Sequence, residues 1–180
     1  MRLRDVDRDG RLDVLAACFD GQSVSVLRGK GDGTLLPRTD VSAGSPLSVD
    51  AADFDGDGKP DLVSDTTAFA VITNRGNGDG TFQPLGIQNG TIETDVVTAD
   101  FNGDGRADVG GAGFVLGGLD VYLGFGDGTF ESVRSFGLRN NNDQQDALVA
   151  GDFNGDGLAD AAVTDRKFGH VVVYVNTTPH

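Results

Sequence analysis

Four nine-residue segments of the chain place oxygen-bearing side chains at positions 1, 3, 5 and 9. They share the pattern D-x-[DN]-x-D-G-x-x-D and are "DVDRDGRLD" (5–13), "DFDGDGKPD" (53–61), "DFNGDGRAD" (100–108) and "DFNGDGLAD" (152–160), here called loops 1 to 4. Side-chain oxygens at positions 1, 3 and 5 can converge on one centre, because the glycine at position 6 permits a sharp turn. A backbone carbonyl at position 7 and the aspartate at position 9 complete an all-oxygen cage. Such a cage suits Ca²⁺ better than Mg²⁺ or zinc, so each loop is a candidate calcium site.

Two other interpretations of these loops deserve comparison. An EF-hand shares the first half of the pattern, but it requires a bidentate glutamate at position 12 and flanking helices. The residues at position 12 are Ala16, Ser64, Gly111 and Val163, and the flanking segments are strand-like, which excludes an EF-hand. The loops could also be solvated Asp/Gly turns that bind nothing. Four copies in one register argue against that second interpretation.

The spacing of the loops defines an internal repeat. Successive loops start 48, 47 and 52 residues apart, and a second marker, G-D-G-T, begins at Gly31, Gly78 and Gly126. Between these markers lie short segments rich in valine and isoleucine and bounded by Gly, Asn and Asp, which is typical of β-strands. Four short antiparallel strands in a unit of about 48 residues match the size of a β-propeller blade.

The sequence therefore predicts an all-β fold, a propeller-type array of about four 4-stranded antiparallel blades. We expect the array to be part of a larger propeller; the alternatives are an open four-blade arc and a half-ring that pairs with a second copy. Residues 1–180 form a single repeat domain. The expected blades are 1–43, 44–91, 92–141 and 142–180, the last without its outer strand. The phenylalanines at position 2 of the loops are expected in the cores between blades; they are Phe54, Phe101 and Phe153.

Composition limits the partners and the sources of stability. A formal net charge of −14 and a pI near 4.2 argue against nucleic acid and anionic membranes, which bind basic patches. No apolar run approaches the roughly 18 residues of a membrane-spanning segment. A single cysteine, Cys18, excludes an internal disulfide, so calcium is the expected staple of the fold. Four bound Ca²⁺ ions would change the formal net charge from −14 to −6.

At these motifs the chain resembles the FG-GAP/VCBS repeat family, the calcium-loop propeller blades also found in integrin α-subunit heads. The signature D-F-[DN]-G-D-G-x-x-D followed by G-D-G-T-F carries the resemblance, which extends over essentially all 180 residues. It implies about four Ca²⁺ ions, one per repeat. The implied side-chain ligands are Asp5, Asp7, Asp9, Asp13, Asp53, Asp55, Asp57, Asp61, Asp100, Asn102, Asp104, Asp108, Asp152, Asn154, Asp156 and Asp160. Arg11, Lys59, Arg106 and Leu158 are expected to contribute backbone carbonyls only.

The function expected from these features is a non-catalytic, calcium-binding propeller module for protein or glycan recognition or adhesion. Its calcium sites, if as weak as about 10⁻⁴–10⁻³ M, fill outside a cell, so the expected location is secreted or cell-surface. The alternative is a propeller segment of a secreted polysaccharide-acting enzyme, a lyase or hydrolase, because some polysaccharide lyases carry similar blades. The chain has only two histidines and no plausible Ser-His-Asp set, which favours the non-catalytic interpretation.

Recognition is expected on the face opposite the calcium loops, where the connecting loops differ most between repeats. The candidate contact residues there are Arg139, Asn141, Arg166, Lys167, Phe168 and His170, which could equally be ordinary solvated loop residues. No nucleic acid and no membrane insertion are expected. Further blades or a second copy of the chain are expected partners that would close the ring.

Overall fold

A computed structural model of the protein describes residues 1–68, 70–90, 93–113, 118–137 and 145–178. Over these residues the chain forms fifteen β-strands and no helix, in agreement with the predicted all-β class. Accordingly, no helix in the described part of the chain has the length and apolarity needed to cross a membrane.

The strands form four antiparallel sheets that follow one another along the chain. Sheet 1 contains β1 (Arg2–Arg4), β2 (Asp13–Cys18), β3 (Ser23–Leu27) and β4 (Thr39–Ser42). Sheet 2 contains β5 (Val49–Ala52), β6 (Asp61–Thr66), β7 (Ala70–Gly76) and β8 (Phe82–Asn89). Sheet 3 contains β9 (Glu93–Ala99), β10 (Asp108–Gly113), β11 (Leu119–Tyr122) and β12 (Arg134–Phe136). Sheet 4 contains β13 (Gln145–Gly151), β14 (Asp160–Asp165) and β15 (His170–Tyr174).

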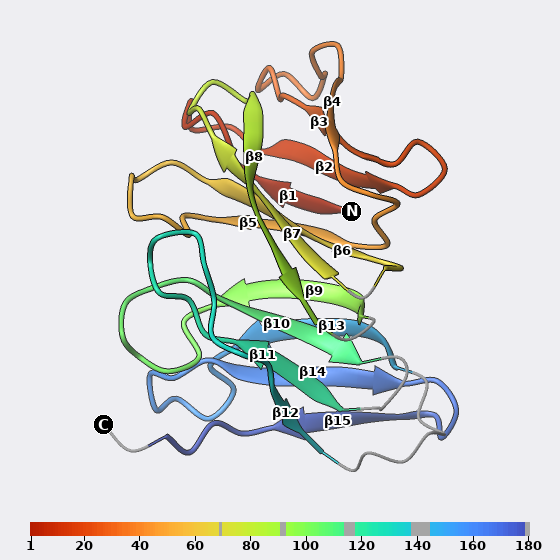
Figure 1. Ribbon diagram of the computed structural model, residues 1–180, viewed down its shortest axis with the longest axis vertical. Helices are drawn as coiled ribbons and strands as arrows, with labels where there is room; N and C mark the ends of the chain where they lie inside the picture. The colour runs from red at the N-terminus through yellow and green to blue at the C-terminus, as the bar shows by residue number, and fades with distance from the viewer. Residues whose placement is uncertain (69, 91–92, 114–117, 138–144, 179–180) are drawn as a thin grey trace.

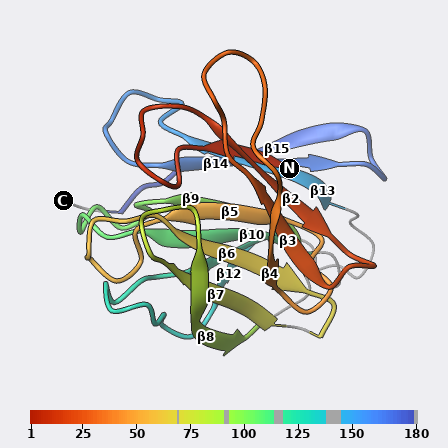
Figure 2. The same ribbon diagram turned by 90° about the horizontal axis from the view of Figure 1, so that it is seen from above.

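The four sheets are the blades of a β-propeller. In each sheet neighbouring strands pair in chain order, so every blade is an up-and-down meander whose first strand lies on the inner side. The first strands approach one another, with β1 beside β5, β5 beside β9 and β9 beside β13. Sheets 1 and 4 lie at opposite ends of the long axis (Figure 1), and β8 and β15 lie on opposite sides of β5 and β9 (Figure 2).

Apolar side chains are buried between successive blades rather than within one blade. Each strand sends alternate residues to opposite faces of its sheet, so a blade contributes one row of side chains to each of two neighbours. The core between sheets 1 and 2 centres on Leu15 and Leu62. The core between sheets 2 and 3 contains Phe54 and Tyr122, and that between sheets 3 and 4 contains Phe101.

The position-2 phenylalanines test the predicted core directly. Phe54 and Phe101 have only 2% and 7% of their surface exposed, which confirms the prediction for loops 2 and 3. For Phe153 the prediction is wrong, since 51% of its surface is exposed. The physical reason is that each position-2 side chain packs toward the following blade, and no described sheet follows sheet 4.

The G-D-G-T segments form tight turns between the third and fourth strands. In each turn both glycines have positive φ, for example +77° at Gly31 and +85° at Gly33, which a side chain would disfavour. Between them Asp32 accepts hydrogen bonds from the backbone N–H and the hydroxyl of Thr34, at 2.9 and 2.6 Å. These bonds hold the pKa of Asp32 below its usual value, so the turn keeps an ionised aspartate.

Candidate metal centre

Each candidate loop joins the first and second strands of its blade, at the inner end of the sheet. The glycine at position 6 has φ between +81° and +88° in all four loops. Position 4 also has positive φ, and it is glycine in loops 2 to 4 but Arg8, at +61°, in loop 1. The backbone of the loop therefore takes one shape four times, as the repeated spacing predicts.

The aspartate at position 1 organises the loop backbone around its carboxylate. In loop 2 the two oxygens of Asp53 accept the N–H groups of Gly56 and Gly58, each at 2.8 Å. The corresponding bonds in loop 4 reach Asp152 from Gly155 and Gly157, at 2.7 and 3.0 Å. Hydrogen bonds from these backbone groups lower the pKa of Asp152, so it is ionised at neutral pH.

The aspartate at position 9 is fully buried and acts as a latch between strands. Asp61 accepts the N–H of Phe54 at one oxygen, at 3.0 Å, and the N–H of Gly76 at the other, at 2.8 Å. It thus ties the start of its own loop to the end of the third strand. The same pair of bonds recurs in every blade, made by Asp13, Asp108 and Asp160 to backbone groups at the equivalent positions.

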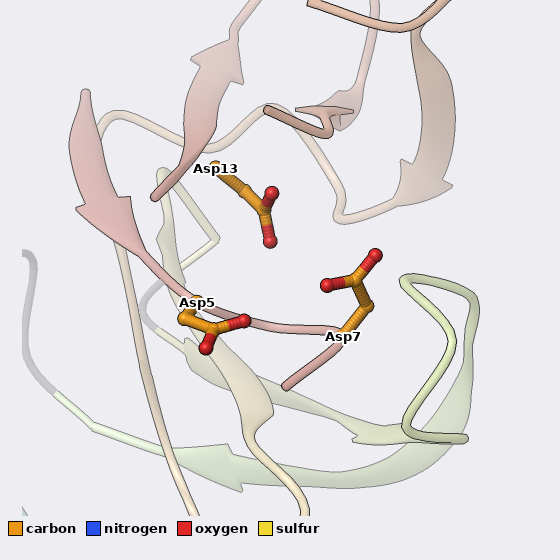
Figure 3. Close-up of side chains that lie close together, drawn as sticks. All are labelled: Asp5, Asp7 and Asp13. Carbon is orange, nitrogen blue, oxygen red and sulfur yellow. The ribbon is translucent and has the colours of Figure 1, made fainter. Parts of the chain in front are cut away.

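Oxygens of the predicted ligands converge in loops 1 and 2. One oxygen from each of Asp5, Asp7 and Asp13 lies within 4.8 Å of the others, and Asp13 projects from the start of β2 toward the other two (Figure 3). In loop 2 the converging group is Asp53, Asp55 and Asp57, which supplies positions 1, 3 and 5. Two ligands on one Ca²⁺ ion, each about 2.3–2.6 Å from it, can be at most about 5 Å apart. The observed convergence therefore fits a calcium cage.

Loops 3 and 4 have the same hydrogen-bonded backbone with one fewer carboxylate, and the convergence of three carboxylates is found in loops 1 and 2 among the described residues. Position 3 is Asn102 or Asn154, whose side-chain oxygen accepts the N–H of the position-5 residue at 2.9 Å, as the aspartate does in loop 2 at 3.1 Å. The amide nitrogen of Asn102 donates to Asp104 at 3.1 Å. The amide oxygen thus occupies the place of a carboxylate oxygen, and the donor set stays entirely oxygen.

Burial makes the negative charge of the latch costly without a counter-ion. It raises the pKa of Asp61 to about 6 and that of Asp108 to about 6, against the opposing effect of their backbone hydrogen bonds. Neighbouring loop carboxylates add to the increase in both cases. A bound divalent cation would reverse this effect, because it favours the ionised form of every carboxylate around it.

Basic side chains surround the loops in a way that the sequence pattern did not indicate. In loops 1 to 3 the basic side chain at position 7 pairs with the aspartate at position 5, as Arg11 does with Asp9 at 3.0 Å and Lys59 with Asp57 at 2.9 Å. The residue at position 7 therefore contributes a charged side chain as well as a backbone carbonyl. The contact with Lys59 lowers the pKa of Asp57.

The loops lie against the G-D-G turn of the following blade. The N–H of Gly128 in the turn of blade 3 donates to the carbonyl of Phe54 in loop 2, at 2.8 Å. Arg28, at the end of the third strand of blade 1, likewise donates to the carbonyl of Asp79 in the turn of blade 2, at 3.1 Å. The candidate loops and the G-D-G turns therefore share one face of the propeller, and this face also joins neighbouring blades.

The candidate contact residues of the opposite face are only partly described. Arg139 and Asn141 lie outside the described residues. Phe168 stacks on His170 with ring centroids 5.9 Å apart, and the Lys167 ammonium lies 5.3 Å from the centre of the Phe168 ring. Phe168 is well exposed, and Arg166 pairs with Asp146 at 3.3 Å. The loop between β14 and β15 thus presents a cationic and aromatic cluster.

A cavity of about 580 Å³ opens between sheets 3 and 4. Apolar side chains such as Leu119 of β11 and Phe136 of β12 line it. Its polar lining residues include Arg134, Tyr174 and Asn176.

Comparison with known proteins agrees with the repeat. Residues 5–64, which include loops 1 and 2, match the family model of the FG-GAP-like repeat. No curated protein matches the chain.

Solved structures resemble the whole chain. An Agrocybe aegerita lectin that recognises non-reducing terminal N-acetylglucosamine is 26% identical with a TM-score of 0.60, over 98% of this chain and 52% of the lectin. The Photorhabdus luminescens Tc holotoxin pore is 22% identical with a TM-score of 0.59, over 98% of this chain and 9% of that one. BBS1N, solved in complex with ARL6DN, is 10% identical with a TM-score of 0.57, over 99% and 57%. The chain thus spans about half the length of the lectin.

Proposed function

We propose that this β-propeller, whose residues 5–64 form FG-GAP-like repeat sequence, is a non-catalytic calcium-binding module that recognises a protein or a glycan outside the cell. The observation that carries the proposal is the oxygen cage of the loops. In loops 1 and 2 three carboxylates converge within 4.8 Å, although like charges at this distance repel by a few kcal/mol at an effective dielectric near 20. Divalent cations are the ligands that such an arrangement selects.

Each cage would hold one ion through the oxygens at positions 1, 3, 5 and 9 and the carbonyl at position 7. When bound, the ion would neutralise carboxylates that otherwise repel one another and would cross-link the first strand to the second. The chain itself supplies the shape of the cage, because the position-1 carboxylate fixes the loop backbone and the position-9 latch fixes the third strand. Weak sites of about 10⁻⁴–10⁻³ M would fill at extracellular calcium and empty in cytosol.

The recognition surface belongs on the face away from the loops. Its exposed Lys167, Phe168 and His170 cluster offers stacking and cationic contacts on a rigid scaffold. The likeness to a lectin supports a glycan as ligand. The alternative is a propeller segment of a secreted polysaccharide-acting enzyme, which a lyase assay on pectic polymers would test.

A further partner is proposed for the exposed face of sheet 4. Phe153, Val171, Val173 and Val175 each have at least half of their surface exposed. The three cores between described blades show what covers an equivalent face, namely the next blade of the same repeat. A second copy of the chain can supply such a blade through sheet 1, where Leu35 is also exposed.

Thermal unfolding with calcium and with chelator tests the proposal. Ligand at 100 times its dissociation constant stabilises a protein by about 2.7 kcal/mol per site. For a chain of this size about 1 kcal/mol shifts the melting temperature by roughly 2–4 °C, so chelation is expected to lower it by at least about 10 °C. Magnesium at the same concentration serves as control and should restore little. A melting temperature that is the same in calcium and in chelator would exclude calcium as a stabiliser of the fold.

A further inference from the structure

Two positions of the repeat vary together between blades. One is position 3 of the loop. The other is the residue directly before the donor to the latch, which lies within one residue of the last residue of the third strand and is called below the residue ending that strand. The pairs are Asp7 with Arg28, Asp55 with Arg75, Asn102 with Leu123 and Asn154 with Val175. Where loop position 3 is aspartate, the residue ending the third strand is arginine. Where loop position 3 is asparagine, the residue ending the third strand is apolar. Every pair has a net charge of zero.

The two charged pairs are in direct contact. In blade 2 the guanidinium of Arg75 donates from Nε and Nη2 to a single carboxylate oxygen of Asp55, whose side chain is 2% exposed. In blade 1 Nη1 of Arg28 lies 3.5 Å from Asp7, which is also mostly buried. The carboxylate at position 3 is therefore shielded from solvent and neutralised by an arginine, rather than by water.

The two uncharged pairs have zero net charge because neither residue is ionised. In blade 3 the amide of Asn102 donates to Asp104, and Leu123 lies in the core between sheets 3 and 4. In blade 4 the amide of Asn154 donates to Asp156 at 2.9 Å, and Val175 takes the place of the arginine. Burying Asp55 beside a leucine would leave an unpaired charge, whereas the Arg75 side chain is 43% exposed and needs no buried partner of its own.

We propose that the residue ending the third strand, through its pairing with loop position 3, sets the charge of each loop and thereby its affinity for calcium. Arg28 and Arg75 are internal counter-cations that offset the additional carboxylate of loops 1 and 2. The inference rests on the proposed calcium function. Ligand charge is a main determinant of calcium affinity, so a change to one partner alone should shift affinity, and a matched double change should not.

The test is a double-mutant cycle in loop 2 followed by calcium titration. Backbone amide signals of Gly58 and Gly105 report loops 2 and 3 separately, because each N–H donates to the position-1 carboxylate of its own loop. The midpoint of each titration is the calcium concentration at which the amide signal has completed half of its change. We expect Arg75→Leu to lower the Gly58 midpoint about tenfold and Asp55→Asn to raise it about tenfold. The double variant, which recreates the pair of blade 3, should lie within about twofold of the unmodified chain. The Gly105 midpoint should stay constant throughout.

Two further variants separate the effect of charge from the effect of removing the arginine side chain. Arg75→Lys retains the charge and should leave the Gly58 midpoint nearly unchanged. Asn102→Asp adds a carboxylate beside Leu123 and should lower the Gly105 midpoint about tenfold, in a blade where no arginine is removed. Midpoints that respond to calcium but do not move in either single variant would overturn the inference. So would a double variant whose Gly58 midpoint differs from that of the unmodified chain by as much as either single variant does.

Unfolding in chelator separates this inference from the calcium proposal. Without metal, Arg75→Leu should lower the melting temperature, and Asp55→Asn in the same chain should restore it. If neither amide responds to calcium in the unmodified chain, the proposed function fails. The melting temperatures of the single and double variants in chelator then decide whether Arg75 neutralises the charge of Asp55. If the Arg75→Leu variant without metal is as stable as the unmodified chain, Arg75 does not act as an internal counter-cation.

Discussion

Phe54 packs edge-on against Phe130, with ring centroids 5.4 Å apart and ring planes inclined by 71°. The first ring belongs to loop 2 and the second follows the G-D-G turn of blade 3, so the contact joins two blades beside a candidate metal loop. Edge-to-face pairs contribute about 0.5–1.5 kcal/mol beyond the burial of their surface. The hydrophobic core and the metal loop are thus adjacent parts of one interface.

The first prediction follows from this contact. Phe54→Ala should lower the free energy of unfolding by roughly 3–5 kcal/mol, the usual cost of deleting a buried phenylalanine. Phe153→Ala is the matched control, because it occupies the same repeat position but is half exposed, and it should cost about 1 kcal/mol or less. Urea unfolding monitored by circular dichroism measures both. Equal losses in the two variants would show that the interface between sheets 2 and 3 is not the cause.

The second prediction separates the latch from the other ligands. Asp61→Ala leaves the N–H groups of Phe54 and Gly76 without their acceptor and should cost roughly 2–4 kcal/mol even in chelator. Asp57→Ala removes an exposed position-5 ligand and should leave metal-free stability nearly unchanged while abolishing the calcium response of loop 2. Thermal unfolding in chelator and in calcium distinguishes the two roles. The assignment would be wrong if both variants behaved alike in chelator.

Much of this architecture was predictable from the sequence, for local reasons. The loops, the turns and the strand pattern each depend on residues close together in the chain, so their spacing predicts the blades. The latch was predicted only as a ligand, because its second partner, such as Gly76 for Asp61, is 15 residues away and depends on the register of the third strand. The pairing of Arg75 with Asp55 depends on the same register. The exposure of Phe153 depends on a neighbouring blade, which residue patterns within one repeat do not describe.

The third prediction concerns backbone strain in loop 1. Arg8 has φ of +61° where the other loops have glycine, and a residue with a side chain is disfavoured in this left-handed region by about 1–2 kcal/mol. Arg8→Gly should therefore raise the free energy of unfolding by roughly 0.5–1 kcal/mol after the greater flexibility of unfolded glycine is subtracted. Gly58→Ala provides the opposite case at φ of +81°, where an added Cβ meets only the tip of Arg8, 3.9 Å away. It should destabilise through strain alone. A destabilising Arg8→Gly would contradict the strain argument.

The fourth prediction is a dependence of stability on pH that arises outside the metal loops. One oxygen of Asp65 accepts the N–H groups of Leu47 and Ser48, at 3.0 and 2.6 Å, whereas its Oδ2 is buried with no hydrogen-bond partner among the described residues. Burial raises the pKa of Asp65 to about 6, with a smaller contribution from Asp95. The folded chain therefore binds this proton more tightly than the unfolded chain, whose aspartate pKa is about 3.9.

The sign of the effect follows from proton linkage. Between about pH 4 and pH 6 the folded state holds more protons at Asp65 than the unfolded state, so stability decreases as the pH rises, by at most roughly 3 kcal/mol. Asp65→Asn keeps an acceptor for both N–H groups and should make this decrease smaller. Urea unfolding at about pH 4.5 and about pH 7, both in chelator, measures the difference. An identical pH slope in the variant would assign the dependence to other carboxylates.

The fifth prediction concerns the exposed face of sheet 4. If a second copy covers it, sedimentation of the chain should give a mass above 18.7 kDa that rises with concentration, and Phe153→Asp should return the mass to that of one chain. Phe168→Asp is the control, because this phenylalanine is equally exposed but lies in the loop between β14 and β15, away from the β-sheet face. It should leave association intact. A mass of one chain at every concentration would exclude the second copy.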